Sequence, residues 1–79
     1  MREEYRDLYR NLGLNIAYYR KKRGMTQEAL AEKIGIDQTH MSKIEVASVG
    51  VSLDTLFKLS KALDIPPNQF FDIRGEQKR

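Results

Sequence analysis

Cysteine is absent from this chain of 79 residues, and histidine occurs only once, as His40. The lack of cysteine excludes a disulfide framework and thiolate metal ligands, and a lone histidine makes no metal-binding cluster. The sequence also contains no Gly-rich phosphate loop and no nucleophile with a matched base. We therefore expect no enzymatic activity, no catalytic residues, no metal, no cofactor and no small-molecule ligand.

Long apolar runs are missing as well. No segment approaches the length of a membrane-spanning helix, and the N-terminal stretch MREEYRDLYR carries charges where a secretory signal needs an apolar core. Together with the absence of cysteine, this pattern predicts a soluble cytoplasmic protein that does not bind membranes. Hydrophobic residues make up 41% of the chain, charged residues 32%, and prolines number only two, which is typical of one small folded domain.

What the chain does contain is helical periodicity along most of its length, which predicts an all-α fold of five helices. The first should run to Gly24, and its apolar face is formed by Tyr5, Leu8, Tyr9, Leu12, Ile16 and Tyr19. Gly13 lies inside this helix, where a glycine weakens helix formation. The next three helices should begin at the capping residues Thr26, Asp37 and Ser52, and a short fifth should follow the two prolines.

The same pattern predicts one domain with two short flanks. Residues 12–73 should form the folded domain, residues 1–11 should extend its first helix, and residues 74–79 have nothing to bury and should fray. The N-terminal extension continues the apolar stripe, so it covers either the core of its own domain or a second subunit. The sequence shows no strand pattern, repeat or separable linker.

The second and third predicted helices are each too short to be stable alone and are joined by very few residues. They must therefore cross closely and share a core. Ala31 is small enough for a close crossing, Gly35 can adopt the positive φ that ends a helix, and Ile36, Met41 and Ile44 can fill the angle between the helices. This is the helix-turn-helix pattern, in which the second helix keeps its outer face free for the DNA major groove.

The segments MTQEALAEKIGIDQTHMSKIE and SLDTLFKLSKALDI resemble the phage repressor and Cro type of helix-turn-helix, also called the xenobiotic response element family. The resemblance covers residues 12–71, and its combination of Thr-Gln, Leu-Ala, Gly and terminal Glu is specific. It implies a compact five-helix, lambda-repressor-like domain. Such a domain binds double-stranded operator DNA through the helix at 37–45, usually as a symmetric dimer.

Positions that match the family's motif also carry suitable chemistry for reading DNA. Gln38 can pair with the N6 and N7 edge of adenine, and Lys43 can donate to the O6 and N7 edge of guanine. Thr39 and Ser42 are further candidates for base contacts. Gln27 matches the residue that opens the second helix of the motif and holds a backbone phosphate.

Further phosphate contacts are predicted for His40, Arg23 and Ser48. Arg23 ends the run RKKR, which either attracts phosphate or simply solvates the end of a helix. Polar side chains on the outer face of a surface helix are the ordinary case. Only the helix-turn-helix register favours a DNA-binding role for them.

Arg20 and Glu45 differ from the other charged residues because both lie next to apolar anchors. By the resemblance, they match a pair that joins the first helix to the end of the third. We therefore predict a partly buried, structural ion pair between them, whose truncation costs more than the loss of a surface pair.

The loop that follows the third helix, VASVGVS, departs from the family pattern because it carries no charge. Family members commonly have basic or amide residues there, where the backbone meets DNA. Val49, Val51, Phe70 and Phe71 are candidates for a dimer interface, and we expect one of the two phenylalanines to be buried and the other exposed.

These observations predict a transcriptional regulator, more specifically a repressor, that binds a palindromic operator as a homodimer. A second hypothesis stays open. The same fold can serve as a protein-interaction module, such as an antirepressor or an antitoxin component, that binds a partner protein through the apolar loop and the terminal helices. A large apolar patch formed by the exposed loop together with Phe71 would favour this second hypothesis.

Overall fold

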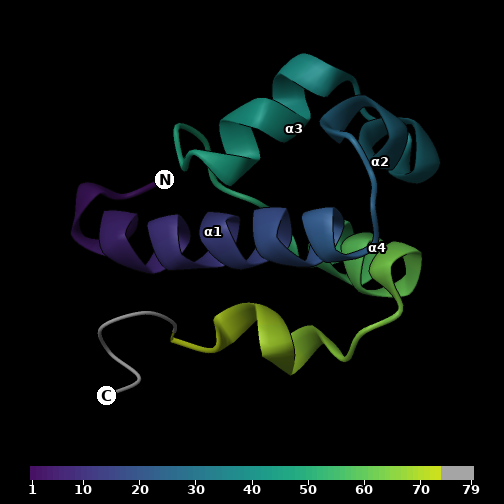
Figure 1. The fold of residues 1–79 in the computed structure, drawn as a ribbon. Helices are drawn as coiled ribbons and strands as arrows, with labels where there is room; N and C mark the ends of the chain where they lie inside the picture. The colour runs from purple at the N-terminus through teal and green to yellow at the C-terminus, as the bar shows by residue number, and fades with distance from the viewer. Residues whose placement is uncertain (74–79) are drawn as a thin grey trace.

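The computed structural model describes residues 1–73 of the chain, and the predicted fraying of residues 74–79 lies outside them. Within the described part there is no strand. Its four α-helices are α1 (Arg6–Lys22), α2 (Gln27–Ile34), α3 (Gln38–Glu45) and α4 (Leu53–Leu63), and two 3₁₀-helices, η1 (Glu3–Tyr5) and η2 (Pro67–Phe71), flank them (Figure 1). The predicted all-α helix-turn-helix fold is confirmed.

The prediction of five α-helices is wrong, because the last element is the 3₁₀-helix η2. Pro66 and Pro67 have no backbone N–H, so the first turn of this element lacks donors. The N–H of Gln69 donates to the carbonyl of Pro66, and that of Asp72 donates to Gln69, each three residues back. The backbone is already extended at Asp72, which leaves too few residues for a second turn with α-helical bonds.

The helix boundaries follow the capping residues that the sequence contains. The side chains of Thr26, Asp37 and Ser52 each accept a hydrogen bond from the backbone N–H three residues on, at the start of α2, α3 and α4. Gly35 ends α2 in the left-handed conformation, with φ of 84°. Local hydrogen bonds therefore fix the two short helices and the tight turn between them.

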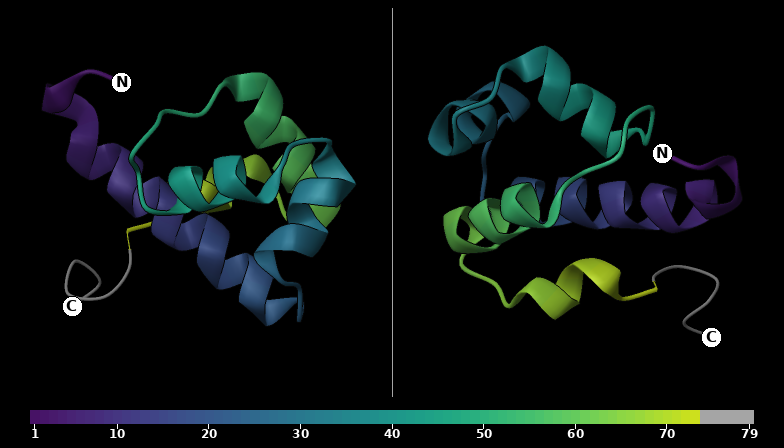
Figure 2. Two further views of the ribbon diagram at one scale, coloured as in Figure 1. Left: turned by 90° about the horizontal axis from the view of Figure 1, so that it is seen from above. Right: turned by 180° about the vertical axis from the view of Figure 1, so that it is seen from behind.

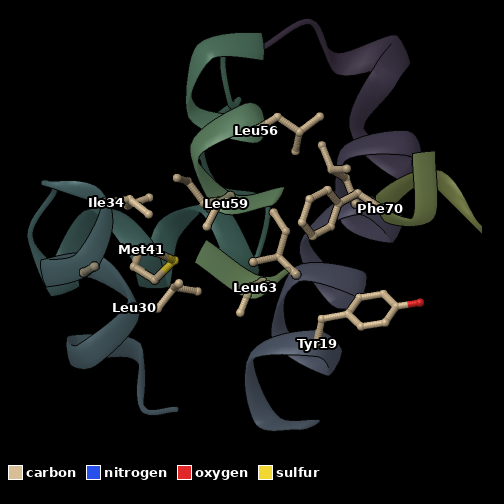
Figure 3. Packing of buried hydrophobic residues seen from close by; sticks show 12 residues of the cluster. Tyr19, Leu30, Ile34, Met41, Leu56, Leu59, Leu63 and Phe70 are labelled. Carbon is tan, nitrogen blue, oxygen red and sulfur yellow. The ribbon is translucent and has the colours of Figure 1, made fainter. Parts of the chain in front are cut away.

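The helices are arranged around α1, which runs between α3 on one side and η2 on the other (Figures 1 and 2). The core lies where α1, α2, α3 and α4 meet. Figure 3 shows side chains from all of these elements pointing into it. The fully buried apolar side chains of this core include Ile16, Leu30, Met41, Leu59, Leu63 and Phe70.

Phe70 is fully buried, and its ring packs edge-on against that of Tyr19 at a centroid distance of 6.3 Å. Its proposed place in a dimer interface is therefore wrong. Phe71, in contrast, is exposed, as expected for one of the two phenylalanines. A 3₁₀-helix repeats every three residues, so neighbouring side chains point in very different directions.

A buried asparagine holds η2 in place. The amide of Asn15 on α1 donates to the carbonyl of Phe70 at 2.8 Å and to that of Asp72 at 2.6 Å. These bonds satisfy carbonyls at the end of η2 that the short helix leaves unpaired. Asn15 is fully buried, so it belongs to the core despite its polarity.

The crossing of α1 and α3 depends on Gly13. A Cβ atom at this position would lie 2.4 Å from the carbonyl oxygen of Glu45 and 2.7 Å from that of Ile44. The backbone of α1 therefore touches the last turn of α3 directly. Gly13 weakens α1 as an isolated helix, but it allows the close approach that sets the position of α3.

No helix in residues 1–73 has the length and apolar character that a membrane crossing requires.

Candidate nucleic-acid interface

The helix α3 has a buried inner face and a polar outer face. Met41, Ile44 and Glu45 are buried, whereas Gln38, Thr39, His40 and Lys43 are exposed and Ser42 is partly buried. Residues 38, 39, 42 and 43 share one side of the helix because positions three and four apart are neighbours on a helical surface. All four predicted base-contacting residues thus lie together on the side of α3 that faces away from the core.

Glu45 anchors the end of α3 to the end of α1. Arg20 donates from Nε to Glu45 Oε2 at 2.7 Å and from Nη2 to Glu45 Oε1 at 3.1 Å, a bidentate ion pair. The two side chains are only 9% and 5% exposed. The third nitrogen, Nη1, donates to the carbonyl of Met25 at 2.8 Å, so the same guanidinium also fixes the loop before α2.

Gln27 joins this network. Its side-chain amide donates to Glu45 Oε1 at 2.9 Å, a bond that the sequence did not predict. The carboxylate of Glu45 therefore receives hydrogen bonds from both α1 and α2, and it locks the start of α2 against the end of α3. The backbone N–H groups of Gln27 and Glu28 have no acceptor within α2, because they lie in its first turn, and they are the groups best suited to a phosphate.

Arg23, a predicted phosphate contact, is exposed and has partners within the fold. Its Nε donates to the carbonyl of Leu63 at 2.7 Å, and its Nη2 donates to that of Asp64 at 3.1 Å. The guanidinium thus binds the C-terminal carbonyls of α4, where a cation is also favoured by the helix dipole. Arg23 therefore connects the end of α1 to α4, and its phosphate contact stays a prediction.

The loop after α3 combines a polar and an apolar part. Ser48 is exposed, and its N–H donates to the carbonyl of Lys43 at 2.9 Å. Val49 and Val51 are partly buried against the core. Ala47 is buried in the left-handed conformation, with φ of 61°. These three residues are therefore packed onto the domain, whereas Val46 at the start of the loop is exposed.

An apolar groove of 580 Å³ lies on the side of the molecule where α1, the start of α4 and the end of η2 come together. It is lined chiefly by Leu8, Tyr9, Leu12, Val51, Leu53 and Phe71. Two of the dimer-interface candidates, Val51 and Phe71, thus line one groove. Val49 does not belong to its lining.

A family model described as helix-turn-helix matches residues 16–70. The chain belongs to this helix-turn-helix family, of the phage repressor and Cro type. Its members include DNA-binding transcriptional regulators.

Curated members of the family are similar to the chain over most of its length. Control protein C.BamHI of Bacillus amyloliquefaciens is 41% identical over 51 residues, which are 65% of this chain and 63% of that protein. The transcriptional regulator SinR of Bacillus subtilis is 33% identical over 66 residues, 82% of this chain and 60% of that protein. The chain thus spans somewhat less than two thirds of these two relatives.

Solved structures from the family have the same fold. The restriction-modification controller protein C.AhdI from Aeromonas hydrophila superposes with a TM-score of 0.80 at 34% identity, covering 89% of this chain and all of that one. SinR in complex with DNA superposes with a TM-score of 0.72 at 34% identity, covering 77% of this chain and 98% of that one.

Three contacts that position the candidate interface could not be predicted from the sequence. The bond between Gln27 and Glu45, the close contact at Gly13 and the binding of Arg23 to α4 all join residues far apart in the sequence. The only signal for Gly13 was a glycine where helix propensity disfavours one, which can also indicate a close approach.

Proposed function

We propose that the protein is a cytoplasmic repressor that binds a two-fold symmetric DNA operator as a homodimer. The observation that carries this proposal is the outer face of α3, where Gln38, Thr39, Ser42 and Lys43 lie together on the side opposite the buried residues of the same helix. DNA binding is supported by the family and by the related SinR structure, which is in complex with DNA. A dimer seated in the major groove of a promoter excludes other proteins from it, which favours repression.

Within this proposal each side chain has a defined role. Gln38 and Lys43 read base edges in the major groove, and Thr39 and Ser42 contribute hydroxyl or methyl contacts. The first turn of α2 at Gln27 binds a backbone phosphate through its N–H groups. His40 and Ser48 reach phosphates on either side of α3, because both are exposed at its flanks.

The apolar groove supports the homodimer, with a second copy of this chain as its occupant. Several of its lining side chains are exposed, notably Leu8, Leu53 and Phe71. The domain measures 32 × 26 × 19 Å. Two copies of this size have to place their recognition helices about 34 Å apart, one turn of DNA, for both to enter two-fold related major grooves.

Selection of bound fragments from sheared genomic DNA tests the proposal. The unaltered protein should enrich a two-fold symmetric motif at near-physiological salt, and the double variant Gln38→Ala, Lys43→Ala should lose it. Each lost base contact is expected to cost about 1 to 3 kcal/mol of binding free energy at one base pair while leaving other positions unchanged.

Lys58→Ala provides the matched control, because Lys58 lies on the surface of α4, beside Lys33 at the end of α2, and carries the same charge as Lys43. It should retain the motif. Absence of any enriched motif with the unaltered protein would contradict the proposal. The role as an interaction module, in which the groove binds a different protein, would then be preferred.

A further inference from the structure

The N-terminal segment, residues 1–6, lies beside the loop that follows α3. Arg6 donates from Nη1 to the carbonyl of Ala47 at 3.5 Å. A Cβ atom on Gly50 would lie 3.6 Å from the Cβ of Met1 and 3.5 Å from the ring of Tyr9. Figures 1 and 2 show the segment and the loop side by side from three directions. Two parts of the chain that are distant in sequence thus form one edge of the molecule.

This edge flanks the C-terminal end of α3. The left panel of Figure 2, the view from above, shows α3 in front of α1, with the loop and the N-terminal segment together at one end of α3. The major groove is only about 12 Å wide, so a duplex that receives α3 also brings its phosphate backbone past the flanks of that helix. The loop and the segment are therefore placed next to the expected path of one DNA strand.

The two parts of this edge differ in charge. The loop residues 46–52 carry none, whereas the segment contributes Arg2 and Arg6. The Nε of Arg2 lies 3.6 Å from Glu4 Oε1, and both side chains are more than 60% exposed. Exposed pairs of this kind are weak, so a phosphate can replace the carboxylate at little cost.

Arg6 is held more firmly. Its Nε donates to both carboxylate oxygens of Glu3, at 3.1 and 3.2 Å, while its Nη1 contacts the loop carbonyl of Ala47. Its side chain is still 42% exposed. The guanidinium is therefore oriented by the fold at the edge of the loop, with part of its surface open to a further acceptor.

We propose that Arg2 and Arg6 bind phosphates of the DNA backbone beside the groove that α3 reads, and so supply the cationic contacts that the uncharged loop lacks. The inference rests on the proposed DNA-binding function and adds a second contact region to it. Glu3 and Glu4 offset the long-range field of the arginines. The contribution therefore comes from direct, charge-assisted hydrogen bonds, which form after α3 has docked.

The salt dependence of DNA affinity tests this proposal. The probes are a duplex that carries the selected motif and a mixed-sequence duplex of equal length. With Arg2→Gln, the slope of log affinity against log salt concentration should decrease in magnitude by about 0.9 on both duplexes, as expected when one phosphate contact is lost. The melting temperature should not change, because the pair of Arg2 with Glu4 is exposed.

Two variants make the result specific. Arg2→Lys keeps the charge and should keep the slope. Lys61→Gln removes the same charge from the exposed last turn of α4 and should also keep the slope. An unchanged slope for Arg2→Gln, or an equal change for Lys61→Gln, would overturn the proposal.

The outcome also separates this inference from the function on which it rests. If the unaltered protein selects a motif and Gln38→Ala with Lys43→Ala loses it, but Arg2→Gln behaves like the unaltered protein, only the N-terminal contact is refuted. If the unaltered protein binds neither duplex, both proposals fall.

Discussion

At the scale of single residues, the position of α3 depends on one carboxylate. Glu45 accepts hydrogen bonds from Arg20 on α1 and from Gln27 on α2, in a nearly water-free site. A buried charge is tolerated only when its partners remain in place, because isolated charges are costly to remove from water. The network therefore couples the parts of the molecule that have to hold a fixed geometry in the proposed complex with DNA.

Arg20→Ala compares the contribution of this buried ion pair to stability with that of an exposed ion pair that has the same N–O distance. Arg10 and Asp7 also lie 2.7 Å apart, but their side chains are 56% and 93% exposed. Arg20→Ala should lower the free energy of unfolding by about 3 to 5 kcal/mol, because it leaves Glu45 buried and unpaired. Arg10→Ala should lower it by less than about 1 kcal/mol. Denaturant unfolding measures both.

A double variant keeps this test informative even if Arg20→Ala does not fold. Replacing both partners, Arg20→Met with Glu45→Leu, removes the buried charge altogether and should recover most of the lost stability. If Arg20→Ala and Arg10→Ala lower the free energy of unfolding equally, burial does not decide the strength of an ion pair in this protein.

At the scale of elements, the contact of α1 with α3 sets the distance of α3, and of its polar outer face, from the rest of the domain. The two backbones approach each other at Gly13, where α1 has no room for a side chain because its Cβ would overlap the backbone carbonyls of α3. Helix propensity and packing therefore act in opposite directions at this position. We expect packing to be the larger effect, because a displaced α3 would also break the hydrogen bonds that join Glu45 to α1 and α2.

Gly13→Ala measures which of the two effects is larger. On an exposed helix this change stabilises by about 1 kcal/mol. Here we expect a loss of about 1 to 3 kcal/mol in unfolding free energy, since the new methyl group overlaps the carbonyls of Ile44 and Glu45. We also expect weaker operator binding, measured by titration of the selected duplex. A gain in stability would mean that α3 can move away without cost.

At the scale of the whole molecule, the apolar groove is the feature that a monomer does not explain. Leu8 on α1 lines the groove and is 67% exposed, and Leu53 at the start of α4 is 63% exposed. Burial of such side chains in a second copy contributes to association in proportion to the apolar area removed from water. Dimerisation would also double the number of DNA contacts.

Leu8→Glu should therefore convert the proposed dimer into a monomer, as measured by sedimentation equilibrium. Leu14→Glu is the matched control, because Leu14 lies on the same helix and is 60% exposed but does not line the groove. It should leave the dimer intact. If the unaltered protein is a monomer, the groove has a different partner. If the protein is a dimer that Leu8→Glu does not affect, the dimer forms through a different surface.

The sequence by itself determined the helices, their caps and the register of the helix-turn-helix. These depend on interactions between residues three or four positions apart, such as that of Asp37 with the N–H of His40. Such local interactions can be predicted from the order of residues alone. For the same reason the polar outer face of α3 was predictable. The final 3₁₀-helix was mistaken for an α-helix, because length and hydrophobic spacing alone do not distinguish the two in five residues.

Only the tertiary structure decided which polar groups are free for the proposed contacts with DNA. Arg23 and Gln27 have suitable side chains, but the fold commits the first to α4 and part of the second to Glu45. It likewise brought Arg2 and Arg6 beside a loop more than forty residues away in sequence. The physical reason is that hydrogen bonds and close contacts between distant elements depend on how the helices cross, which local preferences do not specify.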